Sequence, residues 1–276
     1  MSPLLATDTS SLALLARWHE ASNRIRRVFG APRRLAPRPI NRPTNHSVRR
    51  LNALARALDG VHRYLEIGLA KGTTFENVQV PERWGVDPKP RFATSSLPDQ
   101  TYVFSVPSDQ FFADLDPAIL FDLVFLDGLH SYQQTYRDLL NTLKHSHERT
   151  LVLVDDVVPC DAISAMPDQA ASLRERERQG VPGKAWHGDV FKLILLLSQE
   201  HPELRYRTIV GGDNPQALIW RYGPQSFTPA DSGTVESYLQ SEYTEVFGSG
   251  IPTTFMACDE DQALEDALRD IKGPPD

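Results

Sequence analysis

The segment RYLEIGLAKGTT, residues 63–74, decides the fold class of this 276-residue chain. It begins with a short, mostly apolar run, which is typical of a strand in a buried parallel sheet. Gly68 and Gly72 follow at once, and glycine allows both a tight turn and a close approach to a ligand. A helix beginning after this turn offers free backbone N–H groups. The segment therefore predicts a strand, a ligand-binding turn and a helix.

Similar strands recur along the chain, and residues 108–115 and 131–145 between them are expected to be helices. Apolar strands joined by helical crossovers predict a parallel sheet that is covered on both faces. A Gly/Asn/Pro turn separates two later strands, so these predict an antiparallel hairpin at one sheet edge, fed by a helix over 184–200. The expected strands are 63–68, 83–87, 102–106, 123–128, 150–156, 205–210 and 217–222.

The N-terminal part of the chain has a different character. Residues 10–29 show helical spacing, residues 31–44 contain four prolines and predict a linker, and residues 47–60 predict a helix capped by Ser47. Eleven arginines and three acidic residues in 1–60 favour a solvated basic arm over an acid-binding surface. We expect three parts: this arm (1–60), an α/β domain (61–222) and an acidic helical extension (223–276).

Composition indicates which partners and which cellular compartment to expect. A net charge of −7 argues against nucleic-acid binding, and no apolar run reaches the roughly 20 residues of a membrane span. The N-terminus lacks the basic start of a secretory signal. Two cysteines without metal-type spacing suit a reducing compartment, so a cytoplasmic protein is expected.

Polar residues stand where the predicted strands end, which is where open parallel sheets bind ligands. Asp87, after the second strand, is placed to bind a ribose diol. A dinucleotide site needs the spacing G-x-G-x-x-G, whereas this turn has Glu66-x-Gly68-x-x-x-Gly72. The spacing disfavours a pyrophosphate, and with it an NAD-dependent oxidoreductase, and suits a ligand with one ribose and an amino-acid end.

Residues 60–222 resemble the class I S-adenosylmethionine-dependent methyltransferases. The segments EIGLAKG, GVDP, SDQFF, FDLVFLDGLHSY and TLVLVDDVVP occur in the order and spacing of that family. The resemblance implies a Rossmann-like fold with a mostly parallel seven-stranded sheet, an antiparallel C-terminal hairpin and helices on both faces. It places Gly68 and Gly72 under the methionine portion and Thr74 at its carboxylate. The remaining expected cofactor residues are Glu66, Asp87 at the ribose, Ser108 and Asp109 at the adenine, and Asp127.

The aspartates carry a narrower resemblance. Asp155 follows Asp127 by 28 residues and Asp156 comes next, which resembles the spacing of three Mg²⁺ ligands in catechol O-methyltransferase and in the metal-dependent O-methyltransferases of antibiotic sugars. The sugar enzymes are more similar, because catechol O-methyltransferase has Asn where Asp156 stands. Three oxygen ligands, water and two substrate hydroxyls satisfy the octahedral shell of Mg²⁺. Such a metal would orient the acceptor and lower the pKa of its hydroxyl.

His130 follows Asp127 by three residues, the offset at which catechol O-methyltransferase carries its lysine base. An imidazole can take the acceptor proton near neutral pH, and Asp127 is the competing base. Alternatively, His130 is a structural residue at the start of a helix that is hydrogen-bonded to the loop. The segment WHGDVFK, 186–192, is equally compatible with substrate recognition and with an Asp189 that caps the next helix.

These observations predict a Mg²⁺-assisted O-methyltransferase for a small hydroxylated acceptor, a sugar or glycosylated natural product. A metal-independent enzyme that uses His130 and a non-catalytic S-adenosylmethionine-binding protein are the alternatives. A helical N-terminal arm is a common dimerisation device, which makes a homodimer an expectation as well.

Overall fold

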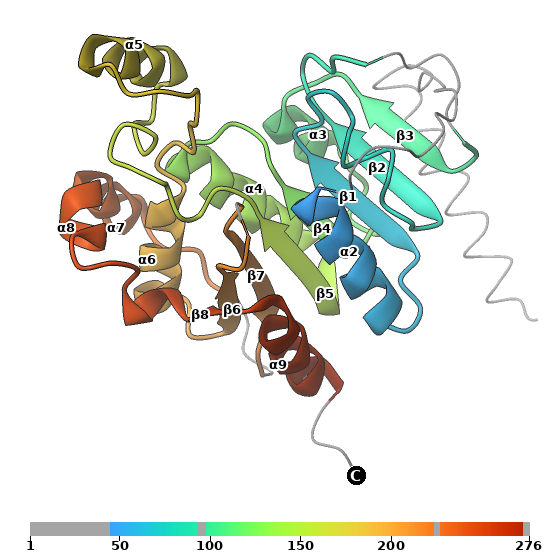
Figure 1. Ribbon diagram of the computed structural model, residues 1–276. Helices are drawn as coiled ribbons and strands as arrows, with labels where there is room; N and C mark the ends of the chain where they lie inside the picture. Colours follow the sequence, from blue (N-terminus) through green and yellow to red (C-terminus); the bar gives the residue numbers. More distant parts are fainter. Residues whose placement is uncertain (1–44, 93–97, 213, 224–226, 273–276) are drawn as a thin grey trace, which may run out of the picture.

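An eight-stranded sheet forms the centre of the computed structural model, which describes residues 45–92, 98–212, 214–223 and 227–272 (Figure 1). The strand order is β3-β2-β1-β4-β5-β7-β6-β8. The first five strands are parallel, and β7 runs antiparallel to both of its neighbours. The strands are β1 (Arg63–Ile67), β2 (Glu82–Val86), β3 (Thr101–Phe104), β4 (Phe121–Leu126), β5 (Ser146–Val154), β6 (Leu204–Ile209), β7 (Gln216–Arg221) and β8 (Ala257–Cys258).

The parallel sheet and its antiparallel hairpin confirm the predicted fold class, with one more strand than the seven expected. The additional strand, β8, pairs in parallel with β6 through two residues of the C-terminal extension. A strand of two residues carries no periodic pattern, so it could not be found in the sequence. The helix and linker predicted within 10–44 lie outside the described residues.

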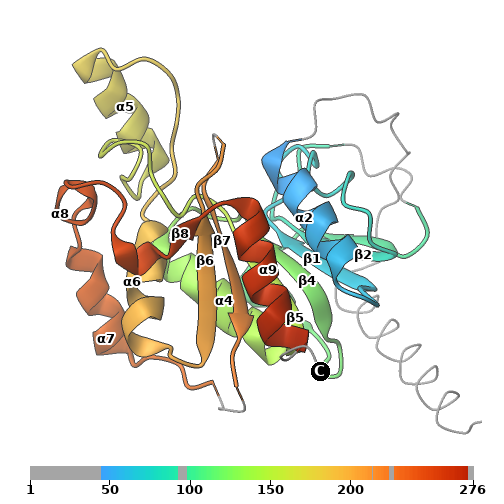
Figure 2. The ribbon, with the colours of Figure 1, turned by 60° about the horizontal axis from the view of Figure 1, so that its bottom comes forward.

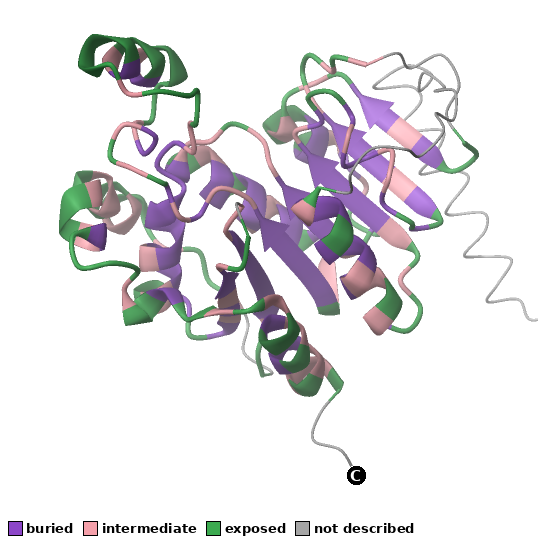
Figure 3. Cartoon of the chain, viewed as in Figure 1, coloured by how far each residue is buried: buried purple, intermediate pink, exposed green. Residues whose placement is uncertain are grey.

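Helices cover both faces of the sheet (Figure 2). Leu139, Ile194 and their neighbours join α3 (Ser108–Asp114), α4 (Tyr132–Lys144) and α6 (Phe191–Glu200) to one face. Leu51 and Ala263 bring α2 (His46–Ala57) and α9 (Glu260–Lys272) to the other. The strands between the two layers are almost entirely buried (Figure 3), as expected of a parallel sheet covered on both sides.

Helix α2 differs from the predicted basic arm in two respects. Asn45, not Ser47, caps it, because the Asn45 side chain accepts a hydrogen bond from the backbone N–H of Val48 at 2.8 Å. The Arg50 side chain is 1% exposed and lies on the apolar side of the helix beside Leu51. Arg50 is therefore part of the protein interior and not of a solvated surface.

Residues 157–190 form a long insertion between β5 and α6 near the carboxyl ends of the strands, and α5 (Gln169–Gln179) stands away from the sheet (Figure 1). Helix α6 begins at Phe191, so the predicted start at residue 184 was wrong. Gly188, at φ +63°, has a conformation that does not continue a helix. The remaining helical segments are α7 (Ser232–Ser237), η1 (Tyr238–Gln240), α8 (Tyr243–Phe247) and η2 (Thr253–Phe255).

Two histidines, His145 and His201, are buried in the protein interior. The imidazole of His145 bonds the carbonyl of Ile119, and that of His201 lies between the Tyr136 hydroxyl and Glu203. Both are satisfied core residues. Within the part of the chain that the structure describes, no helix has the length and apolar character needed to span a membrane.

Candidate active site at the carboxyl ends of the strands

The turn after β1 packs directly against the end of β4. Gly68 has φ +92°, and a Cβ atom there would lie 1.9 Å from the backbone oxygen of Asp127. No other residue fits this position, because both its conformation and the space around it exclude a side chain. The contact joins the expected cofactor loop to the expected acceptor side of the sheet at the switch point between β1 and β4.

Asp87 follows β2 and holds the same turn from the other side. Its Oδ2 accepts the backbone N–H groups of Leu69 (3.0 Å) and Ala70 (2.9 Å), and its Oδ1 accepts that of Lys89 (2.7 Å). A carboxylate has about four acceptor positions, so three bonds leave capacity for a ribose hydroxyl. The carboxylate thus shapes the loop and still fits the predicted ribose role.

Glu66 is a structural anchor beneath the loop. Its carboxyl group accepts the Tyr64 hydroxyl at 2.6 Å and the backbone N–H of Phe75. Burial nevertheless raises the pKa of Glu66 to about 8. The Glu66 side chain is 1% exposed and held by two donors, so it supports the loop from below.

The other predicted cofactor residues lie near the same edge. Thr74, 8% exposed, contacts the Asn45 amide at 3.4 Å. Ser108 begins α3, and its hydroxyl accepts a hydrogen bond from Gln134 on α4 at 3.2 Å. Asp109 is half-exposed and pairs with Arg137 at 3.5 Å. Ser108 and Asp109 follow β3, on the side of β2 and Asp87, as the predicted adenine position requires.

The structure brings Asp127, His130 and Asp156 together. One potential ligand atom from each lies within 4.8 Å of the others. Nδ1 of His130 is 2.5 Å from Oδ2 of Asp156, and its Nε2 is 3.8 Å from Oδ1 of Asp127. With Nδ1–H donating to Asp156, the lone pair of Nε2 is left free to accept a proton. This is the arrangement that a general base needs.

The pKa values of Asp127, Asp155 and His130 are raised in this site. The pKa of Asp127 lies well above its ordinary value because of burial and then because of the nearby charges of Asp155 and Asp156. Burial and the Asp156 charge raise the pKa of Asp155 to about 7. Burial lowers the pKa of His130, but its hydrogen bond to Asp156 and the negative charges nearby outweigh burial and raise it. A cation or a transferred proton would relieve this repulsion.

Asp155 is turned away from His130. Its Oδ1 accepts the side-chain amide of Gln216 at 3.1 Å and the backbone N–H of Asp156 at 2.9 Å. Consecutive strand residues point to opposite faces, so two adjacent aspartates do not present their carboxylates to one point without a special turn. The compact group therefore contains His130 in place of Asp155, which remains beside Asp127.

Two residues of this region were not identified from the sequence, Gln216 on β7 and Arg50 on α2. A signal for Arg50 existed, because it is spaced like Leu54 and Leu58 along the apolar stripe of its helix. No comparable signal marked Gln216.

The segment 186–192 divides into two roles. Trp186 lies edge-on to the His130 ring with centroids 5.0 Å apart, and a Cβ at Gly188 would lie 1.6 Å from the His130 carbonyl oxygen. Asp189 caps α4 by accepting the backbone N–H of Tyr132 at 2.8 Å, and it pairs with Lys192 at 3.2 Å. Asp189 thus caps α4 instead of the helix that follows it.

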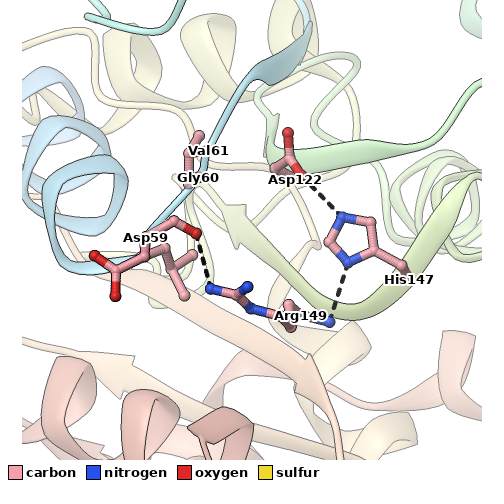
Figure 4. A pocket seen from close by; sticks show the side chains of 7 residues that line it. Asp59, Gly60, Val61, Asp122, His147 and Arg149 are labelled. Atoms are coloured by element: carbon pink, nitrogen blue, oxygen red, sulfur yellow. Dashed lines mark hydrogen bonds and ion pairs between the residues drawn. The ribbon is translucent and has the colours of Figure 1, made fainter. Parts of the chain in front are cut away.

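A small hollow at the opposite end of the sheet contains another Asp–His pair (Figure 4). Nε2 of His147 lies 2.9 Å from Oδ1 of Asp122. Oδ2 of Asp122 accepts the backbone N–H groups of His62 and Arg63, and Arg149 donates to the carbonyl of Asp59. Since these groups already have partners, the hollow is a structural feature of the strand starts.

Comparisons with known proteins agree with this architecture. Residues 51–157 match the model of a family described as a methyltransferase domain. No curated protein matches the chain significantly.

Several solved structures also resemble the chain. Cofactor-bound Rv0187 from MTB is 20% identical, with 80% of this chain and 93% of that chain covered and a TM-score of 0.46. The O-methyltransferase TomG from Streptomyces achromogenes is 18% identical, with the same coverage and TM-score. The O-methyltransferase from Bacillus cereus is 15% identical, with 79% and 94% covered and a TM-score of 0.40.

The family match spans β1, β2, β4 and β5, which carry the glycine turn, Asp87 and the aspartates. Residues 51–157 are therefore similar to a methyltransferase domain. This match agrees with the resemblance to the S-adenosylmethionine-dependent methyltransferases drawn from the sequence motifs.

Proposed function

We propose that the enzyme methylates a hydroxyl group of a small molecule, with a sugar or glycosylated metabolite as the acceptor class. The observation that carries the proposal is the His130–Asp156 pair at 2.5 Å with Nε2 of His130 facing Asp127. An oxygen nucleophile needs a base at this position, because an alcohol is a weak nucleophile until its proton is removed.

His130 and Asp156 supply that base together. The acceptor oxygen attacks the methyl carbon of S-adenosylmethionine and a C–O bond forms as the C–S bond breaks. The bonding pair stays on sulfur, which leaves S-adenosylhomocysteine, and the acceptor proton moves to Nε2 of His130. Asp156 holds Nδ1–H and stabilises the imidazolium that results.

We propose further that Mg²⁺ assists, held by Asp127 and Asp156 with Asp155 close by. The fit rests on the donor set. Burial and then the charges of neighbouring aspartates raise the pKa of Asp127 and of Asp155, and oxygen ligands are those that Mg²⁺ prefers. When bound, such an ion would orient the acceptor oxygens and lower the pKa of the hydroxyl. A metal-independent enzyme is the second candidate, because the hydrogen bond from Nδ1–H of His130 to Asp156 by itself leaves Nε2 available to accept a proton.

The test uses the full chain and methyl-labelled S-adenosylmethionine with a panel of vicinal diols and simple glycosides. We expect calorimetric binding of S-adenosylmethionine, and label transfer that EDTA abolishes and Mg²⁺ restores. Transfer that EDTA leaves unchanged would select the metal-independent enzyme. Failure to bind S-adenosylmethionine would overturn the whole proposal.

The matched pair of variants is His130→Gln and His147→Gln, since each histidine bonds an aspartate at one end of the same two strands. We expect His130→Gln to lower kcat by about 10²–10⁴-fold, the contribution of a general base. His147→Gln should leave kcat unchanged. Equal kcat values for the two variants would exclude His130 as the base.

A further inference from the structure

The side chain of Gln216 connects the active site to the helix on the opposite side of β7. It is completely buried, with Oε1 2.8 Å from Nη1 of Arg50. Its Nε2 donates to the Ser47 hydroxyl at 2.7 Å and to Oδ1 of Asp155 at 3.1 Å. One amide therefore contacts a cation through its oxygen and an active-site carboxylate through its nitrogen.

The orientation of this amide is fixed by chemistry. A guanidinium group only donates hydrogen bonds, so the oxygen of Gln216 has to face Arg50 and the NH₂ group has to face Asp155. Arg50 cannot move away, because it also donates to the carbonyls of Asn214 (2.6 Å) and Gly211 (2.7 Å) and to Glu260 (3.2 Å).

Asp155 in turn fixes the backbone of the next residue, Asp156, through a hydrogen bond. The same Oδ1 that accepts the Gln216 amide also accepts the backbone N–H of Asp156 at 2.9 Å. Asp156 has φ +62°, a left-handed conformation that costs about 1–2 kcal/mol for a residue with a side chain. This turn brings the carboxylate of Asp156 to His130, whereas regular strand geometry would place it elsewhere.

We infer that Gln216, oriented by Arg50, is a positioning residue that holds Asp155 and thereby the left-handed turn that aims Asp156 at His130. The inference rests on the proposed function only in taking His130 as the base. Both Gln216 and Arg50 lie outside residues 51–157, the part that matches the family model. The hydrogen bonds that orient Asp155 therefore depend on how α2 and β7 pack beside the candidate active site. They do not depend on the motifs within the matched residues alone.

The experiment compares Gln216→Met with Thr208→Val in the full-length protein. Methionine keeps the volume of Gln216 and removes its hydrogen bonds. Thr208 is also fully buried, on the neighbouring strand β6, and its hydroxyl has no hydrogen-bond partner, so valine is the matched control. The direct readout is the pair of ring ¹⁵N chemical shifts of His130 in EDTA-treated, histidine-labelled protein. Loss of these signals in His130→Gln assigns them.

We expect Gln216→Met to change the Nδ1 shift of His130 and Thr208→Val to leave it unchanged. In the methyl-transfer assay, kcat of Gln216→Met should fall by about 10–100-fold, as for other supporting partners of active-site ligands. The calorimetric Kd for S-adenosylmethionine should stay within about twofold, because the lost interaction acts on the reaction and not on cofactor binding.

Unchanged His130 shifts together with unchanged kcat in folded Gln216→Met would overturn the inference. Should Gln216→Met not fold, Gln216→Asn tests the same point, because its amide is one methylene too short to reach both Arg50 and Asp155. A wild-type protein without S-adenosylmethionine binding would sink the proposed function, yet the His130 shifts would still decide the positioning role.

Discussion

Strands β4 and β5 carry an Asp–His pair at each end, and the two pairs are in opposite electrostatic states. At the strand starts, Asp122 accepts two backbone N–H groups and His147, and these bonds lower its pKa against the effect of burial. At the strand ends, Asp156 lies 2.5 Å from Nδ1 of His130 and 3.9 Å from Nε2 of His187. Asp155 lies beside this group, and burial and the Asp156 charge raise the pKa of Asp155 to about 7.

The difference separates a structural pair from the pair proposed to act in catalysis. At the strand starts every charge is compensated, so the pair stabilises the fold. At the strand ends an acidic surplus is held in place by the packing around it, at a cost to stability, as is common at functional sites. Aspartate and histidine therefore have different roles at the two ends of the strands, depending on how many hydrogen-bond donors surround each carboxylate.

The largest expected effect is on catalysis. Asp156→Asn keeps the size of the side chain but removes the charge that fixes His130, and kcat should fall by about 10²-fold. Asp122→Asn at the other end should leave kcat per folded molecule unchanged. Initial rates of label transfer measure both, and a comparable loss in Asp122→Asn would remove the functional distinction between the ends.

A truncation to alanine should change stability with opposite sign at the two ends. Asp122→Ala leaves the N–H groups of His62 and Arg63 without their acceptor and should lower the free energy of unfolding by about 1–3 kcal/mol. Asp127→Ala removes one of several repelling carboxylates and should raise the free energy of unfolding. Urea titration in EDTA measures the free energy of unfolding of both variants. Destabilisation by Asp127→Ala would show that repulsion between carboxylates does not lower stability at the carboxyl ends of the strands.

The pH dependence of stability should come from the strand ends. The pKa of Glu66 is raised from its ordinary value of 4.5 to about 8, so the folded protein binds more protons than the unfolded chain between these values. The free energy of unfolding falls with rising pH through this window, and Glu66→Gln removes the part of the fall that comes from Glu66. The Tm advantage of Glu66→Gln over wild type should therefore grow from pH 5 to pH 9.

Asp122→Ala is the control for that profile. Because the pKa of Asp122 is lowered from 3.8, the stability it contributes is lost only as the pH falls below that value. Between pH 5 and pH 9 the Tm of this variant should run parallel to the wild-type curve. If the Tm of Glu66→Gln ran parallel to that of the wild type from pH 5 to pH 9, the pKa of Glu66 in the folded protein would not be raised.

The smallest expected effect concerns Arg149, which donates to the Asp59 carbonyl in the hollow of Figure 4. Arg149→Met removes one hydrogen bond at the surface and should cost at most about 1 kcal/mol, with no change in kcat. Thermal melting and the methyl-transfer assay measure both quantities. A loss of activity would mean that this end of the sheet also contributes to function.

Much of the fold could be predicted because its signals are local. Apolar strands, the turn at Gly68 and the hairpin around 211–216 each depend on neighbouring residues, and the structure has all of them. The start of α6 was misplaced because residues 184–190 are as polar as many first turns. Only the contact of Gly188 with the His130 carbonyl requires an irregular chain there.

The candidate site was predictable only in part, because several of its contacts join distant segments. The spacing of Asp127, His130, Asp155 and Asp156 along two adjacent strands is enough to bring them to one edge. Which carboxylate faces the imidazole depends on Gln216, which is 61 residues from Asp155. No pattern near either residue records that pairing.

The sequence by itself determined seven of the strands along the chain, the glycine turn after the first strand and the set of acidic residues at the strand ends, because periodicity and glycine conformation are properties of short segments. Tertiary structure alone decided that Arg50 is buried, that Gln216 binds Asp155 and that Asp156 turns towards His130. These outcomes depend on which side chains meet once α2, β5 and β7 are packed together. In that setting, a buried hydrogen-bonding group must find a partner from whichever element lies beside it.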